Sequence, residues 1–365
     1  AILHSGLRDI SEIQGDFENG IRYAQLILAD ETLNIAYRGS ALRYLFRNLR
    51  SLGREEEAAD LLKEHEKKLL PKKSQIFKDS VSKRAYLDIK QCALDQLRSQ
   101  GKVESALEMA DTLYTIAITG KRERPELLGD LLTRKSTLEW ALSYYPQALA
   151  DVHRAIAAYK EAGDHFQIEL LQSNLGLINW RMGNLVEAET HMLRAIRYFK
   201  SAGLKQLLAI DKGNLGLVYL SRGNLDRAEE MLNIQQDIAR TINFISELER
   251  ASTNLAVVYY YRNDYLKSLI AFEEAHANFP TTGSKASRFL DSVWISLDHL
   301  KLGHPDKGLA LLNAAWAEYD NPQLNQACVY RRTLSMFLPY EERAPLLLKC
   351  LERARQSHAQ LEEAA

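Results

Sequence analysis

Apolar and polar residues repeat along the chain with a spacing of 40 residues. The segment NLGLINWRMGNLVEA at residues 174–188 returns as NLGLVYLSRGNLDRA at 214–228 and, more altered, as NLAVVYYYRNDYLKS at 254–268. A fixed period of this size is the mark of a solenoid, in which each unit buries its apolar face only against its neighbours. The pattern therefore predicts an array of similar helical units.

A glycine motif marks the turn inside each unit. The glycine can end one helix in a left-handed conformation, and an Asn or Asp directly after it can cap the next helix. A small residue five positions after the glycine lets the two helices approach closely. The predicted turns lie at Gly15, Gly53, Gly101, Ser143, Gly183, Gly223, Asn263 and Gly303. A second series, expected where the second helix of a unit ends, lies at Gly163, Gly203, Asn243 and Gly283.

Together the two series predict a unit of helix, short turn, helix, short turn. The spacing of the inner turns is 40 residues from Ser143 to Gly303, and before that the intervals are 38, 48 and 42. We expect an all-α, right-handed α-solenoid superhelix of about nine antiparallel helix pairs. It would form one repeat domain over residues 1–365, with C-terminal capping helices at 320–365. The first residue is Ala1, and we expect the chain to be a fragment of a longer protein.

Composition supports helices and removes several classes of partner. Gly and Pro number only 18 and 8, and the 47 basic and 48 acidic residues nearly cancel. Such a balance gives no electrostatic reason to expect direct binding of nucleic acid or of an anionic membrane. The three cysteines have no metal-like spacing, which fits a reducing cytoplasm better than a disulfide scaffold. No apolar run approaches a membrane span, and no signal peptide is visible.

The best-preserved segments, 174–188 and 214–228, resemble tetratricopeptide repeats. In that family small residues occupy the eighth and twentieth positions of the unit, where its two helices cross. The matching pairs here are Ser136 with Ala148, Gly176 with Ala188, Gly216 with Ala228, Ala256 with Ser268, and Ser296 with Gly308. The resemblance is specific from about residue 130 to 310, whereas earlier units have Arg8, Phe46 and Leu94 at the eighth position.

Units of this length resemble three groups within that family. One is the C-terminal sensor arm of MalT-like bacterial signal-transduction ATPases, which we favour because the units are numerous and degenerate. The others are the Rap/PlcR-type peptide receptors and the kinesin light chain. The resemblance implies that the first helix of each unit faces the concave side of the array.

No catalytic or cofactor-binding motif is present in the sequence. There is no phosphate-binding glycine loop, no H-E-x-x-H, no C-x-x-C and no G-x-S-x-G. His299 and His304 flank the turn at Gly303, but no carboxylate or cysteine nearby in sequence completes a metal site, and a solvated turn explains them better. Cys92 reads as a small buried hydrophobe. We expect no enzyme activity, no cofactor and no metal.

Asn174, Asn214 and Asn254 each lie nine residues before a turn and are the first candidates for binding. In the peptide-binding members that the chain resembles, an asparagine at this position contacts the main chain of the bound segment. A side-chain amide can pair with both the C=O and the N–H of a peptide, whatever its sequence. The alternative is a tolerated consensus residue that bonds to water or to a neighbouring helix.

Apolar and aromatic residues surround these asparagines at the inward positions. They would line a channel suited to an amphipathic helix or an extended apolar peptide. The alternative is that they pack between adjacent first helices and are not free. The candidates are Leu177, Leu217, Trp140, Trp180, Tyr260 and Tyr261, with Arg181 and Arg250 as polar members.

The leading hypothesis is a non-enzymatic module that binds a protein or peptide segment in its concave groove. It would serve as the ligand-sensing or partner-binding arm of a bacterial signalling or transcription regulator, and other domains of its own full-length chain are possible partners. A peptide-pheromone receptor of the Rap/PlcR type and a passive assembly scaffold remain as alternatives.

Overall fold

The structure is a computed structural model that describes residues 17–52, 54–120, 123–278, 285–318, 333–334 and 336–337. Within these residues the regular elements are all helices, and there is no strand. The chain divides into two compact units, unit 1 at residues 1–182 and unit 2 at residues 183–365. Each unit is described by itself, and the expectation of a single repeat domain stays a prediction.

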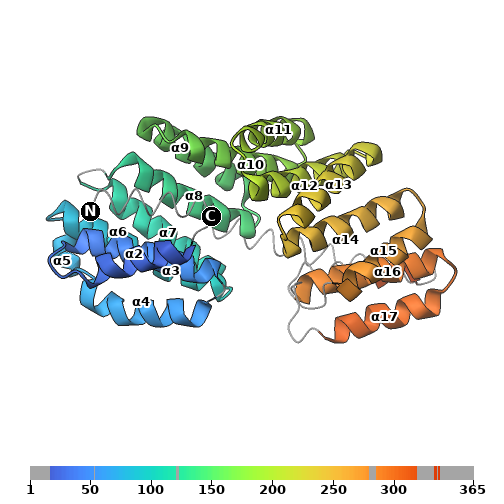
Figure 1. Cartoon of the computed structure of the whole chain (residues 1–365), viewed down its shortest axis with the longest axis horizontal. Coiled ribbons are helices and arrows are strands. Elements are labelled where there is room, and N and C mark those ends of the chain that lie inside the picture. Colours follow the sequence, from blue (N-terminus) through green and yellow to red (C-terminus); the bar gives the residue numbers. More distant parts are fainter. Residues whose placement is uncertain are drawn as a thin grey trace, which may run out of the picture. The chain divides into compact units, whose positions relative to one another are not determined.

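Unit 1 is a series of helical hairpins, coloured blue to green in Figure 1. Three hairpins pair a first with a second helix: α3 with α4, α6 with α7, and α8 with α9. The bounds are α2 (Phe17–Ala29), α3 (Ile35–Ser51), α4 (Glu55–Leu69), α5 (Lys73–Ile76), α6 (Ser80–Ser99), α7 (Val103–Ile118), α8 (Pro125–Ala141), α9 (Tyr145–Ala162) and α10 (His165–Arg181).

Unit 2 repeats the same hairpin with fewer interruptions (Figure 1). Three hairpins again pair a first with a second helix: α12 with α13, α14 with α15, and α16 with α17. The bounds are α11 (Leu185–Ser201), α12 (Lys205–Ser221), α13 (Leu225–Thr241), α14 (Ile245–Tyr261), α15 (Tyr265–Asn278), α16 (Lys285–Lys301) and α17 (Pro305–Ala317).

The predicted turns are confirmed wherever the structure describes them. Every one of these residues has a positive φ, between 54° and 83°. Most are glycines, which adopt this region without steric cost, and two of the exceptions are Asn243 and Asn263, since asparagine tolerates it better than most residues. The predicted turns at Gly15, Gly53 and Gly283 lie outside the described residues.

The predicted helix caps are only partly present. The side chain of Asn224 accepts a hydrogen bond from the Arg227 N–H at 3.2 Å, and Asp264 accepts one from the Lys267 N–H at 3.2 Å. Asn184 occupies the same position before α11 but accepts no capping bond. The motif therefore places the turn correctly without ensuring the cap.

The small residues at the helix crossing behave as predicted in unit 2. A Cβ added to Gly308 would lie 2.6 Å from the Ser296 carbonyl oxygen, and one added to Gly216 would lie 2.9 Å from Leu232 Cγ. A side chain at either glycine would force the two helices of the hairpin apart. Unit 1 solves the crossing differently, because Phe46 and Leu94 are buried at this position opposite Ala58 and Ala106.

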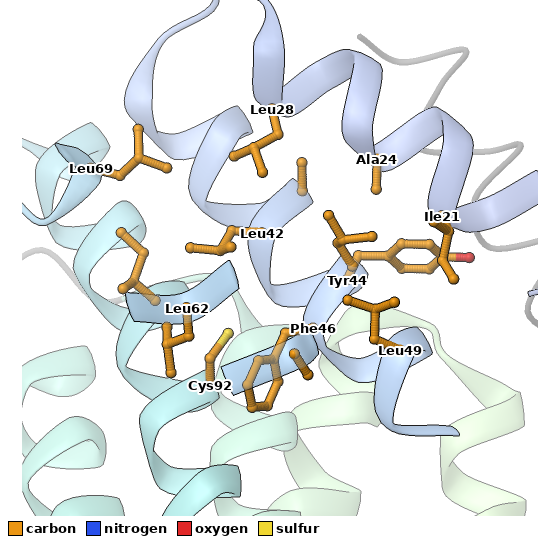
Figure 2. Close-up of a cluster of buried hydrophobic side chains, with 14 residues drawn as sticks. Ile21, Ala24, Leu28, Leu42, Tyr44, Phe46, Leu49, Leu62, Leu69 and Cys92 are labelled. Carbon is orange, nitrogen blue, oxygen red and sulfur yellow. The ribbon is translucent and has the colours of Figure 1, made fainter. Parts of the chain in front are cut away.

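The apolar core of unit 1 begins between α2, α3, α4 and α6. Figure 2 shows Leu42, Phe46 and Leu62 beside Cys92 at its centre. Burial raises the pKa of the Cys92 thiol, so this cysteine acts as the small hydrophobe that the sequence predicts.

Two irregularities of the sequence pattern now have structural causes. The 48-residue interval between Gly53 and Gly101 contains the short helix α5, which follows Pro71 and was not predicted. The described residues hold six complete hairpins within the units, and the first and last of the nine predicted pairs lie mostly outside them.

Candidate functional site

The candidate site in unit 2 is built on its first helices, α12, α14 and α16. Their neighbourhood is direct, since α14 contacts both α12 and α16. The predicted residues Asn214 and Leu217 lie on α12, and Arg250, Asn254, Tyr260 and Tyr261 lie on α14. Their surroundings differ from one residue to the next.

Asn214 is held by neighbouring side chains. It is only 5% exposed, its Oδ1 accepts a hydrogen bond from Arg250 Nη1 at 2.9 Å, and its Nδ2 donates to Asp211 Oδ1 at 3.5 Å. Arg250 Nη2 also donates to the Ile210 carbonyl oxygen at 3.1 Å. The amide of Asn214 therefore joins α14 to α12.

Glu247 fixes the orientation of Arg250. Its Oε2 accepts from Arg250 Nε at 2.9 Å and from Gln235 Nε2, on α13, at 2.7 Å. Charge-assisted bonds of this kind hold a guanidinium more firmly than neutral ones. Arg250 is thus anchored on one side while its side chain stays partly exposed.

Asn254 is the equivalent residue one repeat later, but its amide lacks this partner. Its Nδ2 is buried and donates to no acceptor in the described part of the chain. The cause is visible in the sequence: Arg250 stands 36 residues after Asn214, and Leu290 stands 36 residues after Asn254. Because leucine offers no polar atom to complete the network, Asn254 keeps a free hydrogen-bond donor.

An aromatic cluster continues this face from α14 to α16. The ring of Trp294 lies 5.1 Å from Tyr260 and 5.9 Å from Tyr261, both in edge-to-face geometry, and Tyr260 lies 5.3 Å from Tyr265. Tyr261 is 54% exposed, and Leu290, one helical turn before Trp294, is 44% exposed. Burial raises the pKa of Tyr260 to about 12, so its hydroxyl stays neutral.

Unit 1 holds the remaining predicted residues, which come from α8 and α10. The guanidinium of Arg181 lies 4.5 Å from the ring of Trp180 and 5.6 Å from that of Trp140, a cation–π arrangement. Arg181 is exposed, and the others are partly buried, as are Asn174 and Leu177. Trp140 Nε1 is buried without an acceptor in the described residues.

Ion pairs dominate the first helices α3, α6 and α8 of unit 1, which the sequence analysis missed. Arg43 on α3 donates to Asp88 on α6 at 3.1 Å and to Asp130 on α8 at 2.6 Å. Asp88 also accepts from Ser40 at 2.5 Å, and Asp130 from the Tyr159 hydroxyl at 2.8 Å. Ser40, Asp88 and Asp130 each precede their turn by 13 residues, and this shared register could have revealed the network.

The carboxylates of this network are ionised in spite of their burial. Burial by itself would raise the pKa of Asp88 and of Asp130. The neighbouring guanidinium groups, Arg84 and Arg43 at Asp88 and Arg43 at Asp130, outweigh it and hold both pKa values below the usual range. The face of these three helices is therefore closed by satisfied charges.

The described residues contain no group of three or more His, Cys, Asp or Glu side chains that could hold a metal ion. The rings of His299 and His304 lie 6.4 Å apart. His304 is exposed, as a solvated turn predicts, but His299 is buried, because it belongs to α16 and packs inward. Among the same residues, no helix is long and apolar enough to cross a membrane.

A tetratricopeptide-repeat family model matches residues 167–233. No curated protein has a sequence that matches the chain. Solved structures with the same fold include a Rap protein complexed with competence and sporulation factor, with a TM-score of 0.64 and 13% identity over 90% of each chain. NprR in complex with its cognate peptide NprX has a TM-score of 0.63 and 14% identity, covering 86% of this chain and 87% of that one.

A third similar structure is a signal-transduction ATPase with numerous domains and a tetratricopeptide-repeat sensor, from Pyrococcus horikoshii. The TM-score is 0.53 at 16% identity, and the match covers 83% of this chain but 47% of that one. At such identities these likenesses show a shared fold. With the family match, the confirmed turns and the hairpins of both units, the chain is a tetratricopeptide-repeat protein with an all-α, solenoid-like fold.

Proposed function

We propose that the chain is a non-enzymatic module that binds a peptide or an extended protein segment on the first helices of unit 2. The observation that carries the proposal is the exposed stripe of Leu290, Trp294 and Tyr261 on α14 and α16. Large apolar side chains that stay exposed on one face commonly mark a binding surface, and aromatic residues are enriched among the side chains that carry binding energy.

Polar groups beside the stripe have distinct proposed roles. Asn254 offers an unpaired amide donor, and an unmade hydrogen bond of a buried group costs about 1–3 kcal/mol, which a carbonyl of the bound segment would recover. Asn214 would instead act through Arg250, whose guanidinium it positions. Leu217 and Tyr260 would contribute apolar surface. The three asparagines would therefore act as unequal members and not as a regular ladder.

The residues of unit 1 form a separate candidate surface. Trp140, Trp180 and Arg181 offer a cation–π cluster whose exposed guanidinium could contact an acidic or aromatic partner. Asn174 and Leu177 lie on the same helix as Trp180 and Arg181. We keep this surface as a second contact region for a protein partner.

Known structures of the same fold support a regulatory role. The Rap and NprR structures contain a peptide factor, and the ATPase uses its repeats as a sensor. By analogy, we propose that the chain senses a peptide or a partner segment on behalf of a signalling or transcription regulator. A peptide-pheromone receptor and a passive scaffold are the alternatives, and a cytoplasmic location stays a prediction from cysteine usage.

Selection from a random peptide library tests the proposal. Peptides that bind the wild-type chain are re-measured by titration against Trp294→Ala and Tyr261→Ala. We expect each change to weaken binding about 30-fold or more, since central aromatic contacts contribute about 2 kcal/mol. The matched control is Leu266→Ala, which removes an equally exposed side chain from the second helix α15.

Three outcomes are informative. Loss of binding in the two aromatic variants alone supports the proposal, and equal loss in Leu266→Ala would move the site to another face. Peptides that bind all variants equally would contradict it. A receptor is further distinguished from a scaffold because Asn254→Ala should weaken a short peptide in the first case and leave partner binding unchanged in the second.

A further inference from the structure

Helix α16 carries polar residues where the other repeats have apolar ones. Asp298 occupies the position of Ile178, Val218 and Val258, which lie 40 residues apart and are all buried. Asp298 is buried just as completely, with 0% of its surface exposed. A carboxyl group in an aliphatic core position is expensive unless it is paired or neutral.

The residue that faces Asp298 has changed with it. Ser268 on α15 stands where other repeats have Ala148, Ala188 and Ala228. Its hydroxyl donates a hydrogen bond to Asp298 Oδ2 at 2.8 Å, and Ser268 is itself fully buried. The two departures from the repeat pattern thus form one contact between α15 and α16.

Half of the carboxyl group has no partner. Asp298 Oδ1 is buried and accepts no hydrogen bond from the described residues. The titratable groups that surround it and its neighbour His299 are Tyr260 on α14, Glu273 on α15, His304 in the turn and Lys307 on α17. None of the described cations forms a salt bridge with Asp298. An ionised carboxylate here would lack a counter-charge, whereas a protonated one would be neutral.

We propose that Asp298 and Ser268 form a proton-dependent latch, which holds the hairpin of α16 and α17 against α15 while the carboxyl is protonated and weakens when it ionises. The proton leaves Oδ1 for solvent as the hairpin loosens, and the exposed carboxylate is then hydrated. The inference concerns the fold of unit 2 and does not depend on the proposed peptide-binding function.

The titration range of the group makes the latch relevant near neutral pH. Burial raises the pKa of Asp298 to about 7, against a smaller opposing effect of the Ser268 hydrogen bond. A raised pKa in the folded state means that the stabilisation is fully present below about pH 4 and is lost as the pH rises through 7. Between pH 6 and pH 8 the population of the open hairpin should rise about tenfold from this one group.

Asp291, near the other end of α16, must be separated from this effect. Burial and Glu249 raise its pKa to about 7 as well, although Asp291 is partly exposed. His299 responds in the opposite range, because burial and then Lys307 lower its pKa, so it is neutral at and above pH 7. A test must therefore compare single replacements on the same helix.

Hydrogen exchange of the full chain at pH 6 and pH 8, corrected for the intrinsic pH dependence of exchange, tests the latch. Asp298→Val restores the residue of Val218 and Val258 and should remove about a tenfold pH effect from the amides of α16 and α17. Ser268→Ala, a residue that other repeats accept, should shift the midpoint to higher pH because the bond that favours ionisation is gone. Asp291→Asn, the matched control, should leave the Asp298 component in place.

The outcomes separate cleanly. If Asp298→Val and the wild-type chain show the same pH dependence in α16 and α17, the latch is wrong. It is also wrong if Ser268→Ala moves the midpoint to lower pH. Should Asp298→Val fold poorly, Asp298→Asn, which is neutral and nearly isosteric, gives the same comparison.

Discussion

The first helices of the two units carry different chemistry on one scaffold. In unit 1, Arg43 ties α3 to α6 and α8 through Asp88 and Asp130, so the face is closed by buried charges. In unit 2, Arg250 reaches a neutral amide, and the next helices present Tyr261, Trp294 and Leu290 to solvent. The repeat therefore fixes the hairpin, and the residues on its first helix decide whether the face is sealed or available.

The largest expected effect concerns the sealed face. Replacement of Arg43 by methionine leaves Asp130 and part of Asp88 without their counter-charge, and breaking such a buried pair costs about 3–5 kcal/mol. Urea unfolding followed by hydrogen exchange of α6 and α8 measures it. Arg54→Met, at an exposed ion pair, is the control and should change stability by less than about 1 kcal/mol. A small loss in Arg43→Met would contradict the view that ion pairs close this face.

A pH effect of intermediate size should appear in unit 1. Burial and Asp151 raise the pKa of Glu139 to about 7, in spite of Lys135 at 3.5 Å. Because the folded-state pKa is raised, its contribution is present below about pH 4.5 and lost as pH rises through 7, about 1.4 kcal/mol of it between pH 6 and pH 8. Glu139→Gln should abolish this change in α8 and α9. A wild-type dependence in Glu139→Gln would assign it to another group.

A smaller effect tests the open network of unit 2. Arg250→Met and Asn214→Ala should each destabilise the contact of α12 with α14, and the double variant should lose about 1 kcal/mol less than the sum. The same cycle with Asn254 and Leu290 should show no comparable coupling, since these side chains share no hydrogen bond. Thermal unfolding of the four variants of each cycle measures both couplings. Equal coupling in the two cycles would show that the asparagines are equivalent after all.

The smallest effect compares two helix caps. Asn224→Ala should cost about 1 kcal/mol, because the Asn224 side chain accepts the Arg227 N–H at the start of α13. Asn184→Ala should cost less, since Asn184 makes no capping bond. Thermal unfolding of both variants gives the difference. A larger loss in Asn184→Ala would contradict the cap assignment.

Much of the fold could be predicted from the sequence, because turns depend on local conformation. A glycine or asparagine with positive φ acts at its own position, so Gly163, Gly203 and Asn263 were found from spacing alone. The short helix α5 was missed because it interrupts the period without a repeated signal.

The candidate site could be predicted only as a set of positions. Asn214 and Asn254 share a register, yet their environments depend on Arg250 and Leu290 from the following repeats. The network of Arg43 joins residues up to 87 positions apart, and such pairings become visible only when neighbouring helices are considered together. Which asparagine is engaged and which face is sealed therefore follow from contacts between repeats and not from the repeat itself.

The most direct test of the central claim is hydrogen exchange of the full chain with and without a peptide selected for binding. We predict new protection in α14 and α16, around residues 250–261 and 288–298, and no change in α3, α6 and α8. Protection of α3, α6 and α8 with none in α14 and α16 would contradict the assignment of the binding face to unit 2.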